Sequence, residues 1–223
     1  ANYTKVKRHL VICPATPKIN WEREYKKWDT NGLSIGVAGG DVLPDTDVVI
    51  INYDIVDRHK DRLREIVWDQ ITVDEAHYLK NESSKRTQAI LGELSPRKKG
   101  LGSLTAKRWV FLTGTPVFTR PKDLWTICRF CDPLGLGKSR YAFMVRYCGG
   151  GYDPQGKWVE DGATNLEELQ RIMRTRFMVR REKQDVAADI PPNRSTVILP
   201  KDGLEPLIEA ERATAAEQGR IQR

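Results

Sequence analysis

Short apolar, β-branched runs alternate in the first half of this sequence with stretches whose apolar residues recur at helical spacing. Strands are predicted at HLVIC (9–13), LSIGV (33–37) and DVVIIN (47–52), and a strand that runs into a sharp loop is predicted in both DQITVDEAH (69–77) and KRWVFLTGTP (107–116). Strand and helix following each other in this order predict an α/β fold with a parallel sheet covered by helices. Its chemistry is then expected at the carboxyl ends of the strands, where such folds bind their ligands.

The composition is that of an ordinary globular chain. Charged residues make up 30% of the 223 residues and hydrophobic residues 39%, and no apolar run approaches the ~18 residues of a membrane span. The apolar stretch near the start is about five residues, shorter than the core of a secretory signal peptide. We expect an intracellular protein with no membrane partner, cytoplasmic in a prokaryotic or phage-infected cell and nuclear in a eukaryote.

The net charge of +7 points to a polyanionic partner, although an excess of this size is also common on solvated surfaces. Lys and Arg gather at PRKKG (96–100) and RIMRTRFMVRREK (171–183), where each group could meet a phosphate backbone. Cys128 and Cys131 form a C-x-x-C. A single such pair inside an apolar helical pattern predicts reduced core cysteines rather than a metal or redox site.

A helix is predicted directly after the first strand, over PKINWEREYKKW, with Pro17 at its first position. Thr16 is expected to cap this helix, because a hydroxyl there can accept an otherwise unpaired backbone N–H. The apolar side chains expected near one face of the helix are those of Ile19, Trp21, Tyr25 and Trp28.

The segment TVDEAH (72–77) carries the strongest chemical signal. A β-branched strand that ends in Asp74 and Glu75 places two carboxylates at the edge of the sheet. There Asp74 could hold Mg²⁺, directly or through water, and Glu75 could orient and deprotonate an attacking water, as in enzymes that hydrolyse ATP. The alternative is a pair of exposed acidic residues after a strand.

A second polar turn, TGTP, follows the strand WVFL. Thr113, Gly114 and Thr115 offer two hydroxyls around a glycine, and Pro116 rigidifies the turn. Such a turn could hydrogen-bond His77 and report the state of a nucleotide to a distant site. Taken alone, it would equally fit an ordinary turn between a strand and a helix.

A third stretch, GLGKS, resembles the end of a phosphate-binding loop. That loop has the pattern Gly-x-x-x-x-Gly-Lys-Ser, follows a strand and opens a helix. Here Gly137, Lys138 and Ser139 complete the pattern, but Asp132 stands where its first glycine belongs, and the stretch comes after both DEAH and TGTP. We therefore expect a turn leading into a helix, with Ser139 as the helix cap.

Several motifs in order resemble one known family. VICPATPKINWEREYKKW, INYDIV, ITVDEAHYLKN, VFLTGTPV and MVRREKQDV are similar to the motifs of the first RecA-like lobe in SWI/SNF-type DNA translocases of helicase superfamily II. The likeness runs from about residue 9 to residue 200. TRPKDLW, FMVRYC and GATNLEELQ resemble the annealing-helicase, fork-remodelling branch. The resemblance implies a RecA-like parallel sheet, ATP and Mg²⁺ as cofactors, and double-stranded or branched DNA as partner.

The resemblance also implies roles for matching residues. Asp74 would bind Mg²⁺ and Glu75 would activate water, while His77 and the turn from Thr113 to Thr115 would couple hydrolysis to the grip on DNA. Contacts with the DNA backbone would come from Pro14, Ala15, Thr16, Asn52 and Tyr53, and from Arg180 and Arg181 near the junction between two lobes. For the arginine pair, a solvated charge on an edge strand is the alternative.

The sequence departs from the family in two places. Family members carry a Gly-x-Gly-Lys-Thr loop before the first matching strand, and a second RecA-like lobe whose arginines complete the site. These 223 residues contain neither the loop nor the complete second lobe. We therefore expect these 223 residues to be part of a larger translocase and to be inactive by themselves, since one arginine finger alone contributes ~10³ to 10⁵ in rate. The expected division is a partial RecA-like ATPase lobe (1–120), its helical extension (121–185), and a linker with the start of the second lobe (186–223).

The sequence thus predicts the N-terminal lobe of an ATP-dependent translocase on double-stranded DNA, of the type that remodels or re-anneals DNA, as in DNA repair. One alternative is a strand-separating DEAH-type helicase on DNA or RNA. Another is a degenerate nucleic-acid-binding module that does not hydrolyse ATP.

Overall fold

The computed structural model describes residues 6–94, 102–114 and 120–181. The chain divides into a compact unit that ends at Val179 and a second unit that begins at Arg180. The architecture below is that of the first unit. The expected linker and second-lobe segment (186–223) lies outside the described residues.

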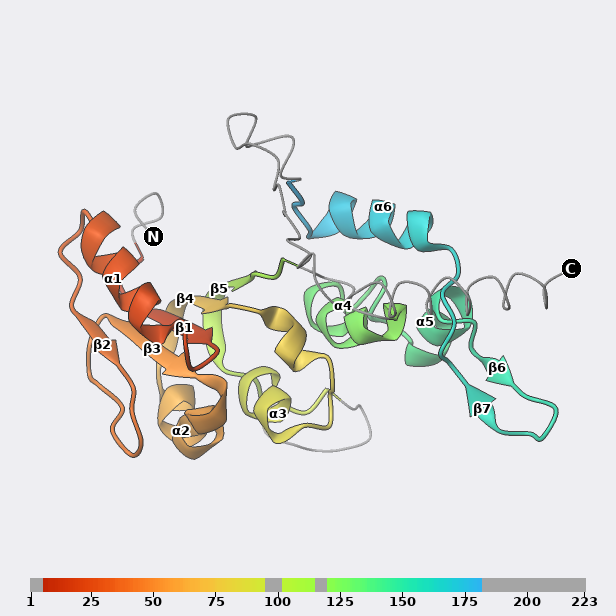
Figure 1. Cartoon of the computed structure of the whole chain (residues 1–223), viewed down its shortest axis with the longest axis horizontal. Coiled ribbons are helices and arrows are strands. Elements are labelled where there is room, and N and C mark those ends of the chain that lie inside the picture. The colour runs from red at the N-terminus through yellow and green to blue at the C-terminus, as the bar shows by residue number, and fades with distance from the viewer. Residues whose placement is uncertain (1–5, 95–101, 115–119, 182–223) are drawn as a thin grey trace, which may run out of the picture. The chain divides into compact units, whose positions relative to one another are not determined.

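A five-stranded parallel sheet forms the centre of the first unit (Figure 1). In the order β2-β3-β1-β4-β5, its strands are Ile35–Val37, Val48–Asn52, His9–Cys13, Val67–Val73 and Thr105–Phe111. Cys13 pairs with Asn52, and Val73 pairs with both Ile12 and Phe111. The predicted parallel α/β sheet is confirmed, and the carboxyl ends of β1, β3, β4 and β5 meet at one edge.

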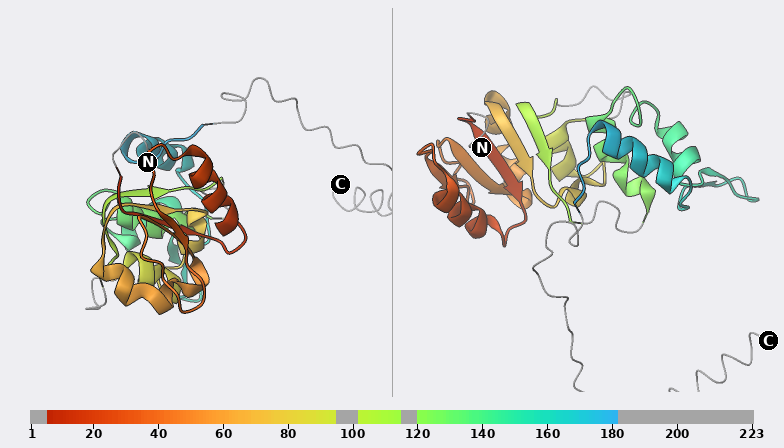
Figure 2. Two further views of the ribbon diagram at one scale, coloured as in Figure 1. Left: turned by 90° about the vertical axis from the view of Figure 1, so that its left-hand side faces the viewer. Right: turned by 90° about the horizontal axis from the view of Figure 1, so that it is seen from above.

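Helices cover both faces of the sheet. Because successive side chains of a strand point to opposite faces, β1 and β3 bury one apolar set on each side. Helix α1 (Lys18–Trp28) packs against Val11 and Ile50 on one face. Helices α2 (Tyr53–Glu65) and α3 (Lys85–Leu91) cover the larger core on the other. Figure 2 shows α1 and α2 on opposite sides of the strands.

Helix α1 corrects two expectations. Thr16 does not cap it, because Pro17 occupies the cap position and no side chain accepts a capping hydrogen bond. Trp21 and Tyr25 pack on the sheet, whereas Ile19 is 58% exposed and Trp28 is 61% exposed. Two residues are about 200° of helical rotation, so Ile19 lies opposite Trp21. Trp28 is the last residue of the helix.

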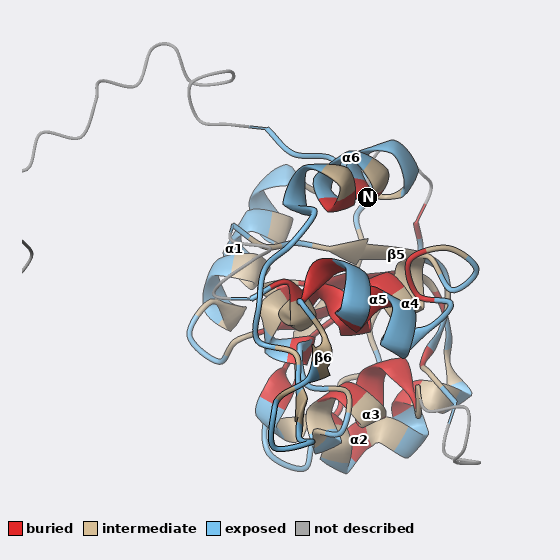
Figure 3. Cartoon of the chain, turned by 90° about the vertical axis from the view of Figure 1, so that its right-hand side faces the viewer, coloured by how far each residue is buried: buried red, intermediate tan, exposed pale blue. Residues whose placement is uncertain are grey.

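The segment after residue 120 is mainly helical, as expected, and has its own apolar core. Its elements are η3 (Pro121–Leu124), α4 (Trp125–Cys131), α5 (Arg140–Tyr147), the hairpin strands β6 (Gly151–Tyr152) and β7 (Trp158–Val159), and α6 (Leu166–Arg176). The core is built from side chains of η3, α4, α5 and α6, among them Leu124, Trp125, Phe143, Leu169 and Met173. Figure 3 shows buried residues on the inner sides of these helices and exposed residues along the outer side of α6.

Two side chains of α4 attach this helical segment to the loop that follows β4. Trp125 donates its indole N–H to Glu82 at 3.0 Å, and the Thr126 hydroxyl donates to the carbonyl of Lys80 at 2.9 Å. Cys128 is buried in α4, and Cys131 is half-buried there. No helix in the described part of the chain has the length and apolar character that a membrane crossing needs.

Candidate functional site

Four of the candidate residues stand where four neighbouring strands end. Pro14 comes after β1, Asn52 ends β3, Asp74 follows β4, and Thr113 lies two residues beyond β5. These are four segments that the sequence singled out, and the parallel sheet gathers them at one edge. β1 and β3 are buried throughout and β4 is buried over its last four residues, so the core holds the backbone that presents Pro14, Asn52 and Asp74, whereas β5 is exposed or half-buried.

Asp74 is held at this edge by four hydrogen bonds, one of which its own backbone N–H donates to the carbonyl of Ile12 at 2.7 Å. Its Oδ2 accepts the indole N–H of Trp21 at 2.9 Å, and its Oδ1 accepts the backbone N–H of Glu75 at 3.0 Å. Its carbonyl oxygen accepts the hydroxyl of Tyr53 at 2.6 Å. Both the carboxylate and the backbone of Asp74 are therefore oriented by neighbouring elements.

Glu75 adopts a left-handed backbone conformation, with φ of 50°. This conformation costs a residue with a side chain roughly 1–3 kcal/mol, and it re-aims the chain at the end of β4. The next residue is fixed to the neighbouring strand, because the Ala76 N–H donates to the carbonyl of Leu112 at 2.8 Å. The Glu75 side chain keeps 42% of its surface exposed, so its carboxylate is open to solvent.

His77 lies in a short 3₁₀ helix (η2, Ala76–Leu79), and its Nδ1 is 3.1 Å from Oε2 of Glu75. Its ring also contacts that of Tyr78. Thr113 and Gly114 follow the point at which Leu112 binds the DEAH loop. Thr115 and Pro116 lie outside the described residues. Leu112, the residue directly before TGTP, thus joins this segment to the DEAH loop through the backbone.

The residues expected to contact DNA lie in different surroundings. Pro14 is half-buried, whereas Ala15 and Thr16 are exposed just before α1. Asn52 is 7% exposed, and Tyr53 is 3% exposed with its hydroxyl on the Asp74 carbonyl. Arg180 and Arg181 are exposed and belong to the second unit of the chain.

Two ionisable groups beside Asp74 keep their protons at neutral pH. Burial raises the pKa of the Cys13 thiol to about 12, and the negative charge of Asp74 adds to this effect. Burial also raises the pKa of the Tyr53 hydroxyl far above its usual value, again with a contribution from Asp74. Tyr53 therefore retains the proton that it donates to the Asp74 carbonyl.

The residues at this edge fit a Mg²⁺ ion that is shared with a nucleotide. A carboxylate has about four acceptor positions, and one is occupied on each oxygen of Asp74, so acceptor capacity remains. Residues 6–94, 102–114 and 120–181 contain no group of three or more His, Cys, Asp or Glu side chains that could enclose a metal. Mg²⁺ does not need such a group of side chains when nucleotide phosphates and water complete its coordination shell beside one or two carboxylates.

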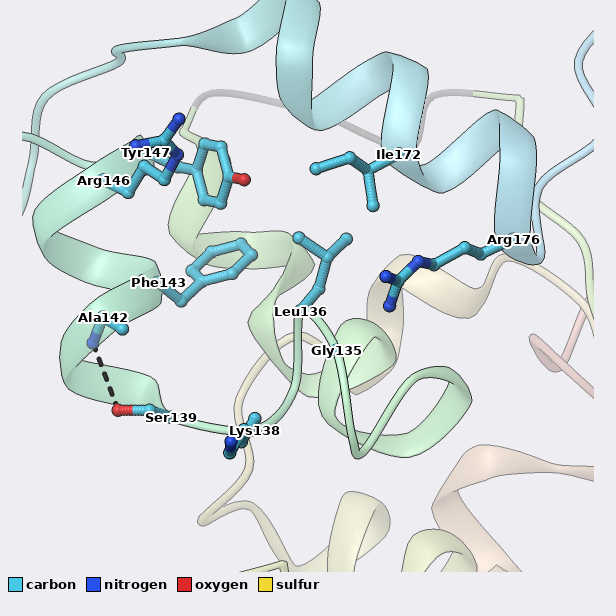
Figure 4. A pocket seen from close by; sticks show the side chains of 10 residues that line it. All are labelled: Gly135, Leu136, Lys138, Ser139, Ala142, Phe143, Arg146, Tyr147, Ile172 and Arg176. Atoms are coloured by element: carbon cyan, nitrogen blue, oxygen red, sulfur yellow. Dashed lines mark hydrogen bonds between the residues drawn. The ribbon is translucent and has the colours of Figure 1, made fainter.

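GLGKS lies in the helical segment, between α4 and α5 (Figure 4). Ser139 caps α5 by accepting the N–H of Ala142, as predicted. Asp132 accepts the N–H of Leu136 at 2.8 Å and binds Arg176 of α6 at 2.7 Å, which fixes the turn. A pocket of about 260 Å³ lies beside this turn, and all its lining residues come from the range 135–176. The stretch is a helix entry remote in sequence from DEAH.

Trp21 is the residue of this site that the sequence did not reveal. Its spacing with Tyr25 predicts an apolar contact with the sheet, and that contact exists. An indole also carries one hydrogen-bond donor, which seeks a partner when the ring is half-buried. The sequence contains that signal, but it does not identify the acceptor, which is 53 positions away.

A parallel sheet with two carboxylates at its carboxyl edge is the arrangement expected of a RecA-like lobe. The family model described as SNF2-related domain matches residues 1–201, and the chain belongs to this family. The expected membership of the SWI/SNF-type family is thereby confirmed.

Similar proteins include the SWI/SNF-related matrix-associated actin-dependent regulator of chromatin subfamily A-like protein 1 of Bos taurus. It is 32% identical over 195 residues, which is 86% of this chain and 20% of that protein. The ISWI chromatin-remodeling complex ATPase ISW2 of Saccharomyces cerevisiae is 28% identical over 201 residues, 84% of this chain and 16% of that protein.

Among solved structures, the Sulfolobus solfataricus SWI2/SNF2 ATPase core in complex with dsDNA matches with a TM-score of 0.62 at 29% identity. The match covers 83% of this chain and 36% of that chain. The present chain spans only 20% and 22% of the length of the curated relatives from Bos taurus and Xenopus tropicalis.

Proposed function

We propose that this chain is the first motor lobe of an ATP-dependent translocase on double-stranded DNA, acting inside the cell. The observation that carries the proposal is the edge of the sheet where Asp74 and Glu75 stand beside the two segments matched to DNA-contacting motifs. One of these segments precedes α1 and the other contains Asn52. Membership of the SNF2-related family and the likeness to an ATPase core bound to duplex DNA support it.

Within this proposal, each acidic residue has one task. Asp74 would hold Mg²⁺, which, when bound with ATP, would neutralise negative charge on the phosphates. Glu75, half exposed and beside His77, accepts a proton from the attacking water. His77 and the turn from Thr113 to Thr115 link this chemistry to DNA. The phosphate-binding loop and a second RecA-like lobe of the longer protein complete the site.

Contacts with DNA are proposed to be contacts with phosphates, which do not depend on sequence. Ala15 and Thr16 are exposed before α1, where the first backbone N–H groups of a helix favour an anion. Asn52 at the end of β3 and the exposed pair Arg180 and Arg181 are the other candidates. A duplex that meets such contacts can be followed along its length by alternating closure of two lobes.

The deciding experiment is ATP hydrolysis by a longer protein that contains this chain, a phosphate-binding loop and a second lobe, with and without duplex DNA. We expect duplex DNA to stimulate hydrolysis. We expect Glu75→Gln to lower the rate of hydrolysis by a factor of about 10² to 10⁴ while ATP still binds. A wild-type rate of ATP hydrolysis that is the same with and without duplex DNA would contradict the proposal. Retained hydrolysis in Glu75→Gln would contradict the assignment of the base.

We further propose a remodelling or annealing activity, as used in DNA repair, rather than strand separation. TRPKDLW, FMVRYC and GATNLEELQ support this choice. Incubating the longer protein with complementary single strands and, separately, with a forked duplex distinguishes the activities. ATP-dependent displacement of a strand without annealing would favour a DEAH-type helicase instead.

A further inference from the structure

We propose that Trp21 is a positioning residue that couples contact with duplex DNA at the start of α1 to the carboxylate of Asp74. The proposal rests on the proposed function and concerns how its site is regulated. It predicts that DNA changes the orientation of Asp74 through one hydrogen bond, from the indole Nε1 of Trp21 to Oδ2.

The two ends of this link lie on different elements. Trp21 belongs to α1, and Asp74 follows β4, with 53 positions between them. The bond is 2.9 Å long and partly buried. Since Oδ1 accepts the N–H of Glu75 from within the same loop, the Trp21 bond is the contact that ties the carboxylate to a separate element.

Helix α1 can transmit a displacement from its N-terminus to Trp21. Three residues of helical rise, about 4.5 Å, separate Trp21 from Lys18, the first residue of α1. The N–H of Trp21 donates to the carbonyl of Pro17 at 2.9 Å, so the indole sits in the turn directly after the segment expected to meet a phosphate. Trp21 and Tyr25 rest on the sheet, and Lys18 donates to the carbonyl of Ala38 at 3.0 Å.

The chemistry of the donor suits this task. An indole N–H carries no charge, so it fixes the direction of the Asp74 carboxylate without neutralising it. A Lys or Arg at the same place would compete with a divalent cation for that charge. Trp21 therefore orients Asp74 and leaves its negative charge available to Mg²⁺.

The second DNA-contacting motif reaches the same residue by another route. Tyr53 is buried and donates its hydroxyl to the carbonyl of Asp74 at 2.6 Å. Its ring stacks on Tyr78, with centroids 5.2 Å apart. Tyr53 thus holds the backbone of Asp74 while Trp21 holds the carboxylate, so a change in α1 can turn the carboxylate about a fixed backbone.

The test uses the longer protein and two matched substitutions in one helix. Trp21→Phe removes the N–H and keeps an aromatic ring. Trp28→Phe is the control, because Trp28 is exposed and donates its indole N–H to Glu24 within α1. The measured quantity is the ratio of ATP hydrolysis with duplex DNA to hydrolysis without it.

We expect Trp21→Phe to lower this ratio about tenfold, as the loss of one hydrogen bond to a charged group allows. Trp28→Phe should leave the ratio unchanged. A purely structural role would lower both rates by the same factor, and that result would overturn the proposal. If duplex DNA does not stimulate the wild type, the proposed function fails as well. Stimulation that Trp21→Phe fully retains overturns the coupling alone.

A second readout does not depend on hydrolysis or on the folding of a variant. The longer protein is labelled with 5-fluorotryptophan, and Mn²⁺ with ADP replaces Mg²⁺. A paramagnetic ion at Asp74 should broaden the fluorine resonance of the nearest indole, which identifies Trp21. In the diamagnetic Mg²⁺ form, that resonance should shift when duplex DNA is added. A resonance that Mn²⁺ broadens but DNA does not shift would overturn the proposal.

Discussion

The side-chain oxygen of Ser139 accepts a hydrogen bond from the backbone N–H of Ala142 at 3.2 Å. This bond caps the first turn of α5. The hydroxyl that would bind a metal in a phosphate loop satisfies a helix N-terminus here. GLGKS therefore resembles a phosphate-binding loop in sequence, but its serine serves as the N-cap of a helix.

Lys138→Ala should leave nucleotide affinity within about twofold of the wild type in the longer protein, because Lys138 is an exposed residue of a helix-entry turn. Equilibrium binding of a fluorescent ATP analogue measures this directly. A collapse of affinity would show that GLGKS binds phosphate after all.

Ser139→Ala should lower the free energy of unfolding by about 1 kcal/mol, since α5 loses the acceptor for one of its unpaired N–H groups. Ser139→Asp is the matched control, because a carboxylate also accepts that N–H and suits the positive end of a helix. Urea denaturation of the three proteins gives the comparison. Equal losses in both variants would contradict a capping role.

Gly137→Ala should destabilise the protein by about 1–3 kcal/mol through steric overlap. A Cβ at this position would lie 2.4 Å from Cα of Arg129 and 2.6 Å from the carbonyl oxygen of Cys128, both backbone atoms of α4. Gly39→Ala is the control, because nothing lies within 4 Å of a Cβ there. Thermal denaturation should therefore separate the two variants. Equal midpoints would refute the close approach of the turn to α4.

The protein should lose stability in acid through His9. This ring is buried, with Nε2 at 2.8 Å from the Thr72 hydroxyl and Nδ1 bonded to Tyr25, and burial lowers its pKa from 6.5 to about 4. The unfolded chain then binds more protons between these values. Stability contributed by neutral His9 is complete above pH 6.5 and falls by about 3 kcal/mol as the pH drops to about 4.

His9→Gln provides the comparison for this pH dependence, because glutamine keeps polar groups and does not titrate. The variant is expected to be less stable at neutral pH. Between pH 6.5 and 4, its unfolding free energy should decline less steeply than that of the wild type, when both are measured by urea denaturation. Parallel declines would mean that His9 is not the group responsible.

Local sequence patterns were enough to predict much of the fold and the position of the two carboxylates of the site. Apolar runs predict the strands because burial on both faces demands apolar side chains at consecutive positions. The positions of Asp74 and Glu75 follow from the end of β4, so the sequence alone could place them at the sheet edge. Their chemical roles stay predictions. The capping of α5 by Ser139 could also be predicted from the sequence, because a helix cap is a contact between residues a few positions apart.

Helix α1 shows where such patterns stop. Spacing alone put Ile19 and Trp28 with Trp21, but the geometry of an 11-residue helix leaves both exposed. Tyr53 was matched to a DNA-contacting motif, and the structure buries it against the carbonyl of Asp74. Neither outcome can be read from neighbours in sequence, because each depends on which surface the helix meets.

By itself, the sequence determined the strands, the carboxylates that end β4 and the helix entry at GLGKS, because each depends on residues that are close along the chain. Only the tertiary structure decided that β1 lies between β3 and β4 and that α1 brings Trp21 to Asp74. The physical reason is that strand order and packing between elements are set by long-range burial and hydrogen bonding. These long-range contacts determine that the indole N–H of Trp21 donates to the carboxylate of Asp74.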